Sequence, residues 1–456
     1  MTVAASLATS PHMLTATDAA NRIRSGALAV ETLVRSCLAR IEARDAEIRA
    51  WTHVSREAAL HAARELDKTP PQGLLHGIPI AVKDVIDTKD MPTGHNSPIY
   101  LGHVTGHDAA CVATLRAAGA VILGKTDTTE FAAAGRHAAT RNPADLTRSP
   151  GGSSAGSAAA VADGHVPLAL GTQTGGSTIR PASFCGVFAF KPSWAAVSRE
   201  GLKLYSVTFD TLGWFARSVA DLQVLADVFG IADDVAPQRV AVEGLRIALC
   251  RPFPALIEPA SADALTSAVR ILREAGADVM ELTLPSEFDE LNAIHKIILY
   301  SEGRAAFLNL YHSHFAVLHD DFKHRVENRD GFTRADLKRA YDIAAQCRVA
   351  FDELASGFDA VLAPSARGEA PPGREPGDPG LNQIWTLLHV PCVNVPGFKG
   401  ALNLPVGVTL TGPRFTDRRL LAAADAVAGA LTRAGVQSPM RASASCCVQS
   451  RVMSTE

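Results

Sequence analysis

Apolar side chains along this chain follow two alternating patterns. Spacings of three and four residues, typical of amphipathic helices, predict helices over residues 30–43, 109–118, 218–229, 261–275, 334–355 and 420–434. Short apolar runs lie between these segments and predict buried strands over residues 120–124, 166–170, 245–249, 279–284 and 359–363. Strands that alternate with helices in this way indicate an α/β fold built around a parallel sheet.

The pattern is less regular elsewhere. Helices are expected over residues 17–26 and 55–67, and a longer helical region, broken or continuous, over residues 288–318. Further apolar runs predict strands that begin near Gly77 or cover residues 384–388, 392–395 and 406–410. Residues 367–380 are rich in Gly and Pro and are interpreted as a surface loop, because apolar segments resume on both sides. Residues 437–456 are small and polar without periodicity, which predicts a disordered tail.

Composition places the chain among ordinary globular proteins. Of 456 residues, 47% are apolar and 20% charged, and the net charge of -3 gives no reason to expect binding to nucleic acid or to an anionic membrane. The eight cysteines include no CxxC pair, so the sequence indicates neither a zinc site nor a disulfide scaffold. No apolar run has the length of a membrane span, and the N-terminus lacks the basic region of a secretory signal, which predicts a cytoplasmic protein.

Residues 150–192 have the least usual composition in the chain. Two clusters, GGSS at 151–154 and GGS at 175–177, flank a helix of small residues and a short apolar strand. Glycine lets backbone N–H groups approach a ligand closely, and serine supplies hydroxyl groups. A flexible linker would leave the apolar residues between the clusters in water. The segment is therefore interpreted as a functional site.

Three kinds of site can be tested against these clusters. A phosphate-binding loop needs a lysine directly after the glycines, and none is present. The G-x-S-x-G pattern of a nucleophile elbow occurs with Ser154 at its centre, but polar residues 145–150 precede it where an elbow needs a strand. The third kind is a serine hydrolase with a lysine base. Lys83 would serve as that base if burial lowers its pKa, whereas an exposed Lys83 would only be a charge at the end of a strand.

Three segments together resemble the amidase signature family: VKDVIDTKDMPTG from residue 82, GGSSAGSAAAVADG from 151 and GTQTGGSTIRPASFCGVFAFKPS from 171. The likeness extends over residues 17–434, which implies one domain over residues 1–436 with a catalytic core at about 75–220. It also implies a central mixed, largely parallel, twisted sheet covered by helices on both faces. No cofactor and no metal are expected.

The resemblance implies a catalytic triad of Ser177 as nucleophile, Ser153 as bridging serine and Lys83 as base. The two serines are 24 positions apart, as in the family, and the peptide between Gly152 and Ser153 is expected to be cis. Ser154 would then be a neighbour whose hydroxyl caps the following helix. The developing oxyanion would be held by the backbone N–H groups of Thr174, Gly175, Gly176 and Ser177.

Two positions depart from the commoner family pattern. Gln173 stands where many members carry Asp, and Thr178 follows the nucleophile, so that Arg180 sits one position later than in the common order. Four histidines, at 76, 95, 103 and 107, match no common zinc spacing and are interpreted as loop residues. The candidates for lining a substrate pocket, with simple core packing as the alternative, are Thr129, Phe131, Gln173, Tyr300 and Trp385.

The sequence therefore predicts a hydrolase that cleaves small or medium amides, anilides among them, with esters and carbamates accessible to the same triad. The expected partner is a small-molecule substrate, without nucleic acid or membrane, and a homodimer is left open. One alternative is a glutamine-using transamidation subunit that feeds ammonia to a partner. A second is a non-catalytic scaffold, against which the retention of Lys83, Ser153 and Ser177 argues.

Overall fold

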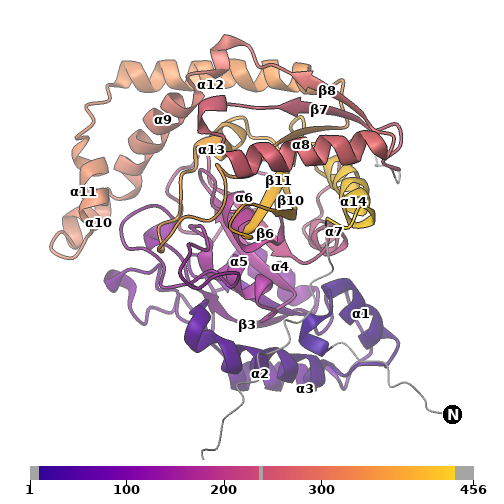
Figure 1. Ribbon diagram of the computed structural model, residues 1–456. Helices are drawn as coiled ribbons and strands as arrows, with labels where there is room; N and C mark the ends of the chain where they lie inside the picture. The colour runs from indigo at the N-terminus through magenta and orange to yellow at the C-terminus, as the bar shows by residue number, and fades with distance from the viewer. Residues whose placement is uncertain (1–9, 236–239, 437–456) are drawn as a thin grey trace, which may run out of the picture.

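The computed structural model describes residues 10–235 and 240–436, so the predicted tail lies outside the described residues. Its centre is an 11-stranded sheet with strand order β1-β3-β2-β4-β6-β5-β10-β11-β9-β7-β8 (Figure 1). The strands are β1 Trp51–Val54, β2 Pro79–Lys83, β3 Val121–Thr126, β4 Leu168–Gln173, β5 Phe188–Lys191, β6 Thr211–Ala216, β7 Arg246–Cys250, β8 Asp278–Leu282, β9 Ala360–Pro364, β10 Cys392–Lys399 and β11 Pro405–Thr411.

Fourteen α-helices surround the sheet in the described residues. They are α1 Ala16–Arg24, α2 Val30–Ile48, α3 Arg56–Leu66, α4 Ala110–Ala117, α5 Ala155–Ala162, α6 Ile179–Cys185, α7 Val219–Val228, α8 Pro259–Glu274, α9 Leu291–Ala306, α10 Leu308–Ser313, α11 Asp320–Glu327, α12 Arg334–Ala355, α13 Gly380–Leu387 and α14 Asp417–Arg433. Within the described ranges, no helix is long and apolar enough to cross a membrane.

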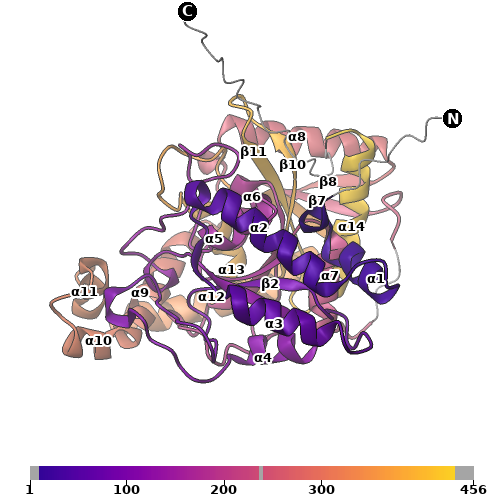
Figure 2. The ribbon, with the colours of Figure 1, turned by 90° about the horizontal axis from the view of Figure 1, so that it is seen from below.

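The helices enclose the sheet. In Figure 1, α2 and α3 lie at one end of the molecule and α8, α9 and α12 at the opposite end, and Figure 2 shows α2 and α3 in front of β2. Strands β2, β3, β4, β5, β6 and β9 are buried along their whole length. Strands covered on both faces become continuous apolar runs. The α/β class and the mixed sheet predicted from the sequence are thus confirmed.

The parallel share of the sheet is smaller than predicted. Strand β2 pairs in parallel with β3 and β4, and β7 with β8 and β9, while the other six pairings are antiparallel. Of these antiparallel pairs, only β10 and β11 are joined by a short connection, residues 400–404, which is too short to join parallel neighbours.

Most predicted elements are present, and helix α12 has the predicted bounds. The prediction of a strand over residues 384–388 is wrong, because these residues end helix α13. Leu381, Ile384 and Trp385 are buried at helical spacing, and periodicity alone cannot separate a short apolar run in a buried helix from a strand. The sequence pattern also did not reveal β1, β5, β6, α6 and α11.

Candidate active site

Lys83 is the last residue of β2, which lies between β3 and β4 in the sheet. Strands β2 and β4 are parallel, so Lys83 and Gln173, the last residue of β4, end at the same edge. The chain after β4 forms the second Gly/Ser cluster, and the first cluster leads into α5. The fold therefore brings the three segments of the family resemblance to one edge of the sheet.

Lys83 is completely buried and has three hydroxyl neighbours. Its Nζ lies 2.7 Å from Ser153 Oγ, 2.9 Å from Ser154 Oγ and 2.8 Å from Thr172 Oγ1. Burial lowers the pKa of Lys83 well below its ordinary value, and the nearby carboxylate of Asp210 opposes this effect by raising it. A buried amine without an ion-pair partner is favoured in its neutral form, which can accept a proton.

Ser153 is held at the junction of several segments. The peptide between Gly152 and Ser153 is cis, as the family resemblance implied. The Gly152 oxygen accepts a hydrogen bond of 2.7 Å from Arg180 Nη2, and the Ser153 oxygen accepts one of 3.4 Å from Thr129 N. Arg180 is buried, and its Nε and Nη1 have no partner in the part of the chain that the structure describes. These contacts fix the backbone on both sides of the Ser153 hydroxyl.

Ser154 does not have the role predicted for it. It precedes α5, but its hydroxyl makes no capping hydrogen bond to that helix. The hydroxyl donates instead to the Thr172 oxygen at 3.2 Å and accepts from Lys83 Nζ. Because the buried lysine needs acceptors, the side chain turns toward the sheet and helps to hold the ammonium or amine group.

The loop 174–177, which joins β4 to the start of α6, has all four of its carbonyl oxygens bound from outside. The Thr174 oxygen accepts from His295 Nε2 (2.9 Å), the Gly175 oxygen from Thr386 Oγ1 (2.7 Å), the Gly176 oxygen from Arg180 N (3.0 Å) and the Ser177 oxygen from Ser154 N (3.4 Å).

The N–H groups of the same loop are left free. Among residues 10–235 and 240–436, no hydrogen-bond acceptor faces any of the four N–H groups of residues 174–177. Because hydrogen bonds hold the carbonyl oxygens, the N–H groups on the opposite side of each peptide remain available to donate to a ligand. Such an arrangement can stabilise negative charge that develops on a carbonyl oxygen of a ligand.

Gln173 is fully buried, and its side chain supports the loop rather than a pocket wall. Its Oε1 accepts from Thr178 N (2.9 Å) and Ile179 N (3.1 Å), so it binds free N–H groups at the start of α6. Its Nε2 donates to Thr386 Oγ1 at 3.0 Å. An Asp at this position could accept but not donate, which explains physically why the chain combines Gln173 with Thr386.

Four residues outside the predicted triad and oxyanion loop hold the parts of the site in place: Arg180, Asp210, His295 and Thr386. Asp210 accepts from Thr174 Oγ1 at 2.5 Å and from Tyr205 N at 2.6 Å, and burial raises its pKa to about 6. His295 is neutral at pH 7, because burial lowers its pKa to about 4. No motif marks Asp210, His295 or Thr386, whereas Arg180 lies in the third segment of the family resemblance, where its position relative to the nucleophile departs from the common pattern.

The predicted pocket residues do not form one group. Thr129 is beside Ser153, and Phe131 packs in an aromatic cluster with Tyr205, Phe307 and Phe322. Trp385 is buried in a different core cluster, where its ring lies 5.6 Å from that of Phe351. Tyr300 accepts a hydrogen bond from Arg325. In the described ranges, neither Trp385 nor Tyr300 bonds to Lys83, Ser153 or Ser177.

The loop that the sequence predicted at residues 367–380 packs over both Gly/Ser clusters. A methyl group added to Gly152 would lie 3.0 Å from Pro376 Cβ, and one added to Gly175 would lie 3.4 Å from Pro379 Cβ. Ser149 N also donates to the Pro371 oxygen at 2.9 Å. Ser177, at the end of the second cluster, is only 8% exposed.

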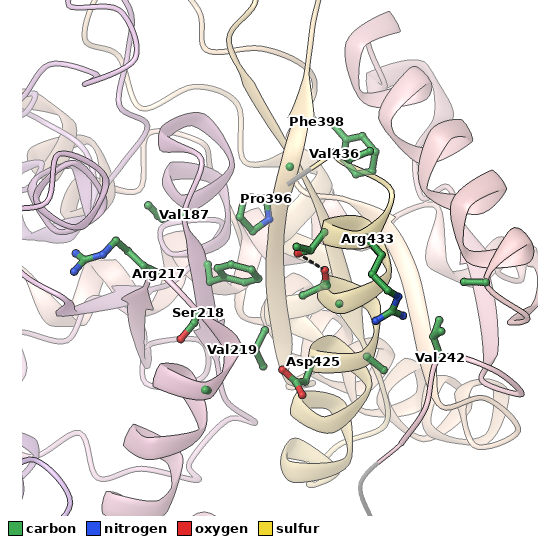
Figure 3. A pocket seen from close by; sticks show the side chains of 18 of the residues that line it. Val187, Arg217, Ser218, Val219, Val242, Pro396, Phe398, Asp425, Arg433 and Val436 are labelled. Carbon is green, nitrogen blue, oxygen red and sulfur yellow. Dashed lines mark hydrogen bonds between the residues drawn. The ribbon is translucent and has the colours of Figure 1, made fainter. Parts of the chain in front are cut away.

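A separate cavity of about 1190 Å³ lies away from this site (Figure 3). Its lining comes from β5, α7, β10, α14 and segments between elements, and includes Val187, Arg217, Val219, Pro396, Phe398 and Arg433. None of Lys83, Ser153 and Ser177 lines it. Among residues 10–235 and 240–436, no group of three or more His, Cys, Asp or Glu side chains could hold a metal ion.

Comparison with known proteins gives a consistent result. A family model described as Amidase matches residues 32–421. The A subunit of glutamyl-tRNA(Gln) amidotransferase from Chloroflexus aurantiacus is 34% identical over 91% of this chain and 96% of that protein, and the protein of the same name from Fusobacterium nucleatum is 31% identical with the same coverage.

Solved structures show the same likeness. The peptide amidase from Stenotrophomonas maltophilia superposes with a TM-score of 0.77 and 28% identity over 92% of this chain and 97% of that one. A chain from a vestigial protein complex, described in connection with the origins of an s-triazine catabolic enzyme, gives a TM-score of 0.83 and 28% identity over 92% of this chain and 99% of that one.

Proposed function

Because the chain belongs to the amidase family, we propose that it hydrolyses the C–N bond of small or medium amides through an acyl-enzyme on Ser177. Anilides are included, and esters and carbamates offer the same triad a carbonyl carbon and a leaving group. Lys83 is the base, Ser153 relays protons, and the N–H groups of residues 174–177 hold the oxyanion.

The observation that carries this proposal is the pattern of contacts around Lys83 Nζ. A neutral amine has two N–H donors and one lone pair. Ser154 Oγ gives its own proton to the Thr172 oxygen and can therefore accept from Lys83, as can Thr172 Oγ1. The lone pair is then left for the proton of Ser153 Oγ, 2.7 Å away. The three neighbours thus match the two N–H donors and the one lone pair of a neutral lysine amine.

The proposed reaction begins when Ser177 Oγ bonds to the substrate carbonyl carbon. Its proton passes to Ser153 Oγ as the Ser153 proton passes to Lys83 Nζ. The loop N–H groups stabilise the oxyanion, and each such donor typically contributes about 3–4 kcal/mol to lowering the barrier. The C–N bond then breaks, and the proton returns through Ser153 to the leaving nitrogen. Water attacks the ester by the same proton path, which releases the acid and restores Ser177.

Replacement of the nucleophile tests the proposal. Ser177→Ala should lower kcat for 4-nitroanilides, 4-nitrophenyl esters and carbamates by about a thousandfold or more, because no acyl-enzyme can form. Ser356→Ala, at the exposed end of α12, is the control and should retain full activity. In the wild type, mass spectrometry after incubation with a slowly deacylating carbamate should find the added acyl mass on the peptide that contains Ser177. A Ser177→Ala protein with the wild-type rate contradicts the mechanism.

A second candidate function is supported by the relatives that are named as glutamyl-tRNA(Gln) amidotransferase subunits and align over 91% of this chain. In that case, the site would hydrolyse glutamine and pass ammonia to a protein partner. Steady-state ammonia release from glutamine by the isolated chain, compared with turnover of the anilide panel, separates the two functions. Glutamine as the best substrate, together with a stable complex recovered by affinity purification, would favour the amidotransferase function.

A further inference from the structure

Lys203 is a half-buried lysine whose ammonium group has no hydrogen-bond or ion-pair partner in the described part of the chain. Its Nζ instead lies over two aromatic rings, 5.7 Å from the centre of Phe131 and 5.2 Å from that of Phe307. Cation–π contacts of this kind contribute about 0.5–2 kcal/mol. They satisfy none of the three N–H donors of the ammonium group.

Two fully buried lysines outside the triad are bound more completely. Lys125 Nζ donates to Thr93 Oγ1 at 2.6 Å and lies 3.4 Å from Asp84, and Lys191 Nζ donates to two carbonyl oxygens at 2.6 and 2.8 Å. The Nζ of Lys203 is not among the buried side-chain atoms without a partner in the described residues, so its N–H donors can reach water or a ligand. Lys203 differs from these two lysines because no protein group in the described residues accepts from its ammonium N–H groups.

Lys203 is attached to the segment that directly follows Lys83. Its backbone N–H donates to the oxygen of Val85, two residues after Lys83. Phe131, which its ammonium group covers, follows two residues after Thr129, and Thr129 N bonds to the Ser153 oxygen. Asp210, which binds Thr174 in the oxyanion loop, acts electrostatically on Lys203 and on Lys83, yet it forms no ion pair with either.

We propose that Lys203 binds a carboxylate group of the substrate, so that the preferred amides carry a negative charge at a short distance from the scissile bond. This inference rests on the proposed function. The ammonium group supplies the donors for the carboxylate, and the fully buried rings of Phe131 and Phe307 hold the lysine side chain in place beneath it. Substrates are then selected mainly by the electrostatic attraction between the Lys203 ammonium group and the carboxylate.

The test compares anionic with neutral substrates. The anionic set comprises the mono-4-nitroanilides of succinate, glutarate and adipate, and the neutral set comprises the alkyl 4-nitroanilides of the same length. In the wild type, kcat/KM should be higher for the anionic set. Lys203→Met, which keeps the length of the side chain, should reduce the anionic-to-neutral ratio by about tenfold or more, and Lys203→Arg should restore part of it.

The matched control is Lys323→Met. Lys323 also covers an aromatic ring, that of Phe315 at 4.3 Å, but it lies on α11. This variant should leave the ratio unchanged, because it removes the same charge from a different place. A ratio that Lys203→Met does not alter overturns the inference while the hydrolase proposal stands.

A binding measurement keeps the two proposals separable. If the wild type hydrolyses no anilide, the proposed function has failed, and calorimetric titration with glutarate mono-4-nitroanilide tests Lys203 directly. Wild-type binding that weakens about tenfold or more in Lys203→Met supports a carboxylate site at Lys203. Equal binding by both proteins, or none by the wild type, overturns it.

Discussion

Lys83 shows how much the chemistry of one residue depends on its surroundings. Three hydroxyl groups surround its Nζ, and no carboxylate in the described residues is close enough to form an ion pair with it. Burial is therefore the main influence on its pKa, which lies well below the ordinary value. A proton acceptor near neutral pH needs such a shift.

The pH dependence of the reaction follows from this shift. Lys83 accepts a proton only when it is neutral, so kcat/KM should fall as the pH falls through its pKa. Asp210 raises that pKa, and Asp210→Asn removes the negative charge. The acidic limb of the pH–rate profile should therefore move to lower pH in this variant.

The pH–rate profiles of wild type and variant check the direction of the shift. Asp233→Asn, which changes a carboxylate that binds the start of α14, is the control and should leave the limb in place. An acidic limb that moves to higher pH in Asp210→Asn would show that Lys83 does not control the rate.

At the scale of elements, the oxyanion loop is positioned by the helix that follows it and by two helices that are distant in the chain. Helix α9 supplies His295, α13 supplies Thr386, and α6 supplies the backbone N–H of Arg180. Each binds one carbonyl oxygen, so the direction of the free N–H groups depends on how these helices pack against the end of β4.

Thr386→Val tests this dependence. It removes the donor to the Gly175 oxygen and keeps the shape of the side chain. We expect kcat to fall by about tenfold or more with little change in KM, because the N–H groups act mainly in the transition state. Thr386→Ser retains the hydroxyl and should retain most of the rate. If Thr386→Val lowers only the free energy of unfolding, by about 1–3 kcal/mol, the role of this hydroxyl is structural.

At the scale of the whole molecule, single carboxylates join parts that are far apart in sequence. Asp221, at the start of α7, accepts hydrogen bonds from Ala16 N (3.1 Å), Thr17 N (2.8 Å) and Thr17 Oγ1 (2.8 Å) at the start of α1. The N-terminal helix is thereby attached to the centre of the fold.

Asp221→Ala should weaken this attachment. It leaves two N–H groups at the start of α1 without their acceptor, which costs about 1–3 kcal/mol in the free energy of unfolding. Urea denaturation measures that loss, and trypsin should cleave α1 after Arg22 or Arg24 sooner than in the wild type. Thr17→Ala removes one of the three bonds and should have a smaller effect. Unchanged stability in Asp221→Ala would show that packing alone holds α1.

Much of the fold could be predicted from local patterns. Helix α12 has its predicted bounds because its apolar stripe is long and regular, and Thr333 with Asp336 forms a capping box at its start. Strands β5 and β6 were missed, although β6 is buried throughout. Gly213 interrupts the apolar run of β6, and β5 has only four residues, so neither gives a period that can be recognised.

By itself, the sequence determined the family, the order of the main elements and the three segments that carry the candidate chemistry. The tertiary structure alone decided which atoms meet. Lys83 reaches Thr172 across 89 positions, and Thr386 reaches Gly175 across 211. The physical reason is the distance along the chain over which each property is set. Apolar periodicity depends on neighbours within a few residues. The pKa of Lys83 and the direction of the loop N–H groups depend on burial and on partners that only the complete packing brings together.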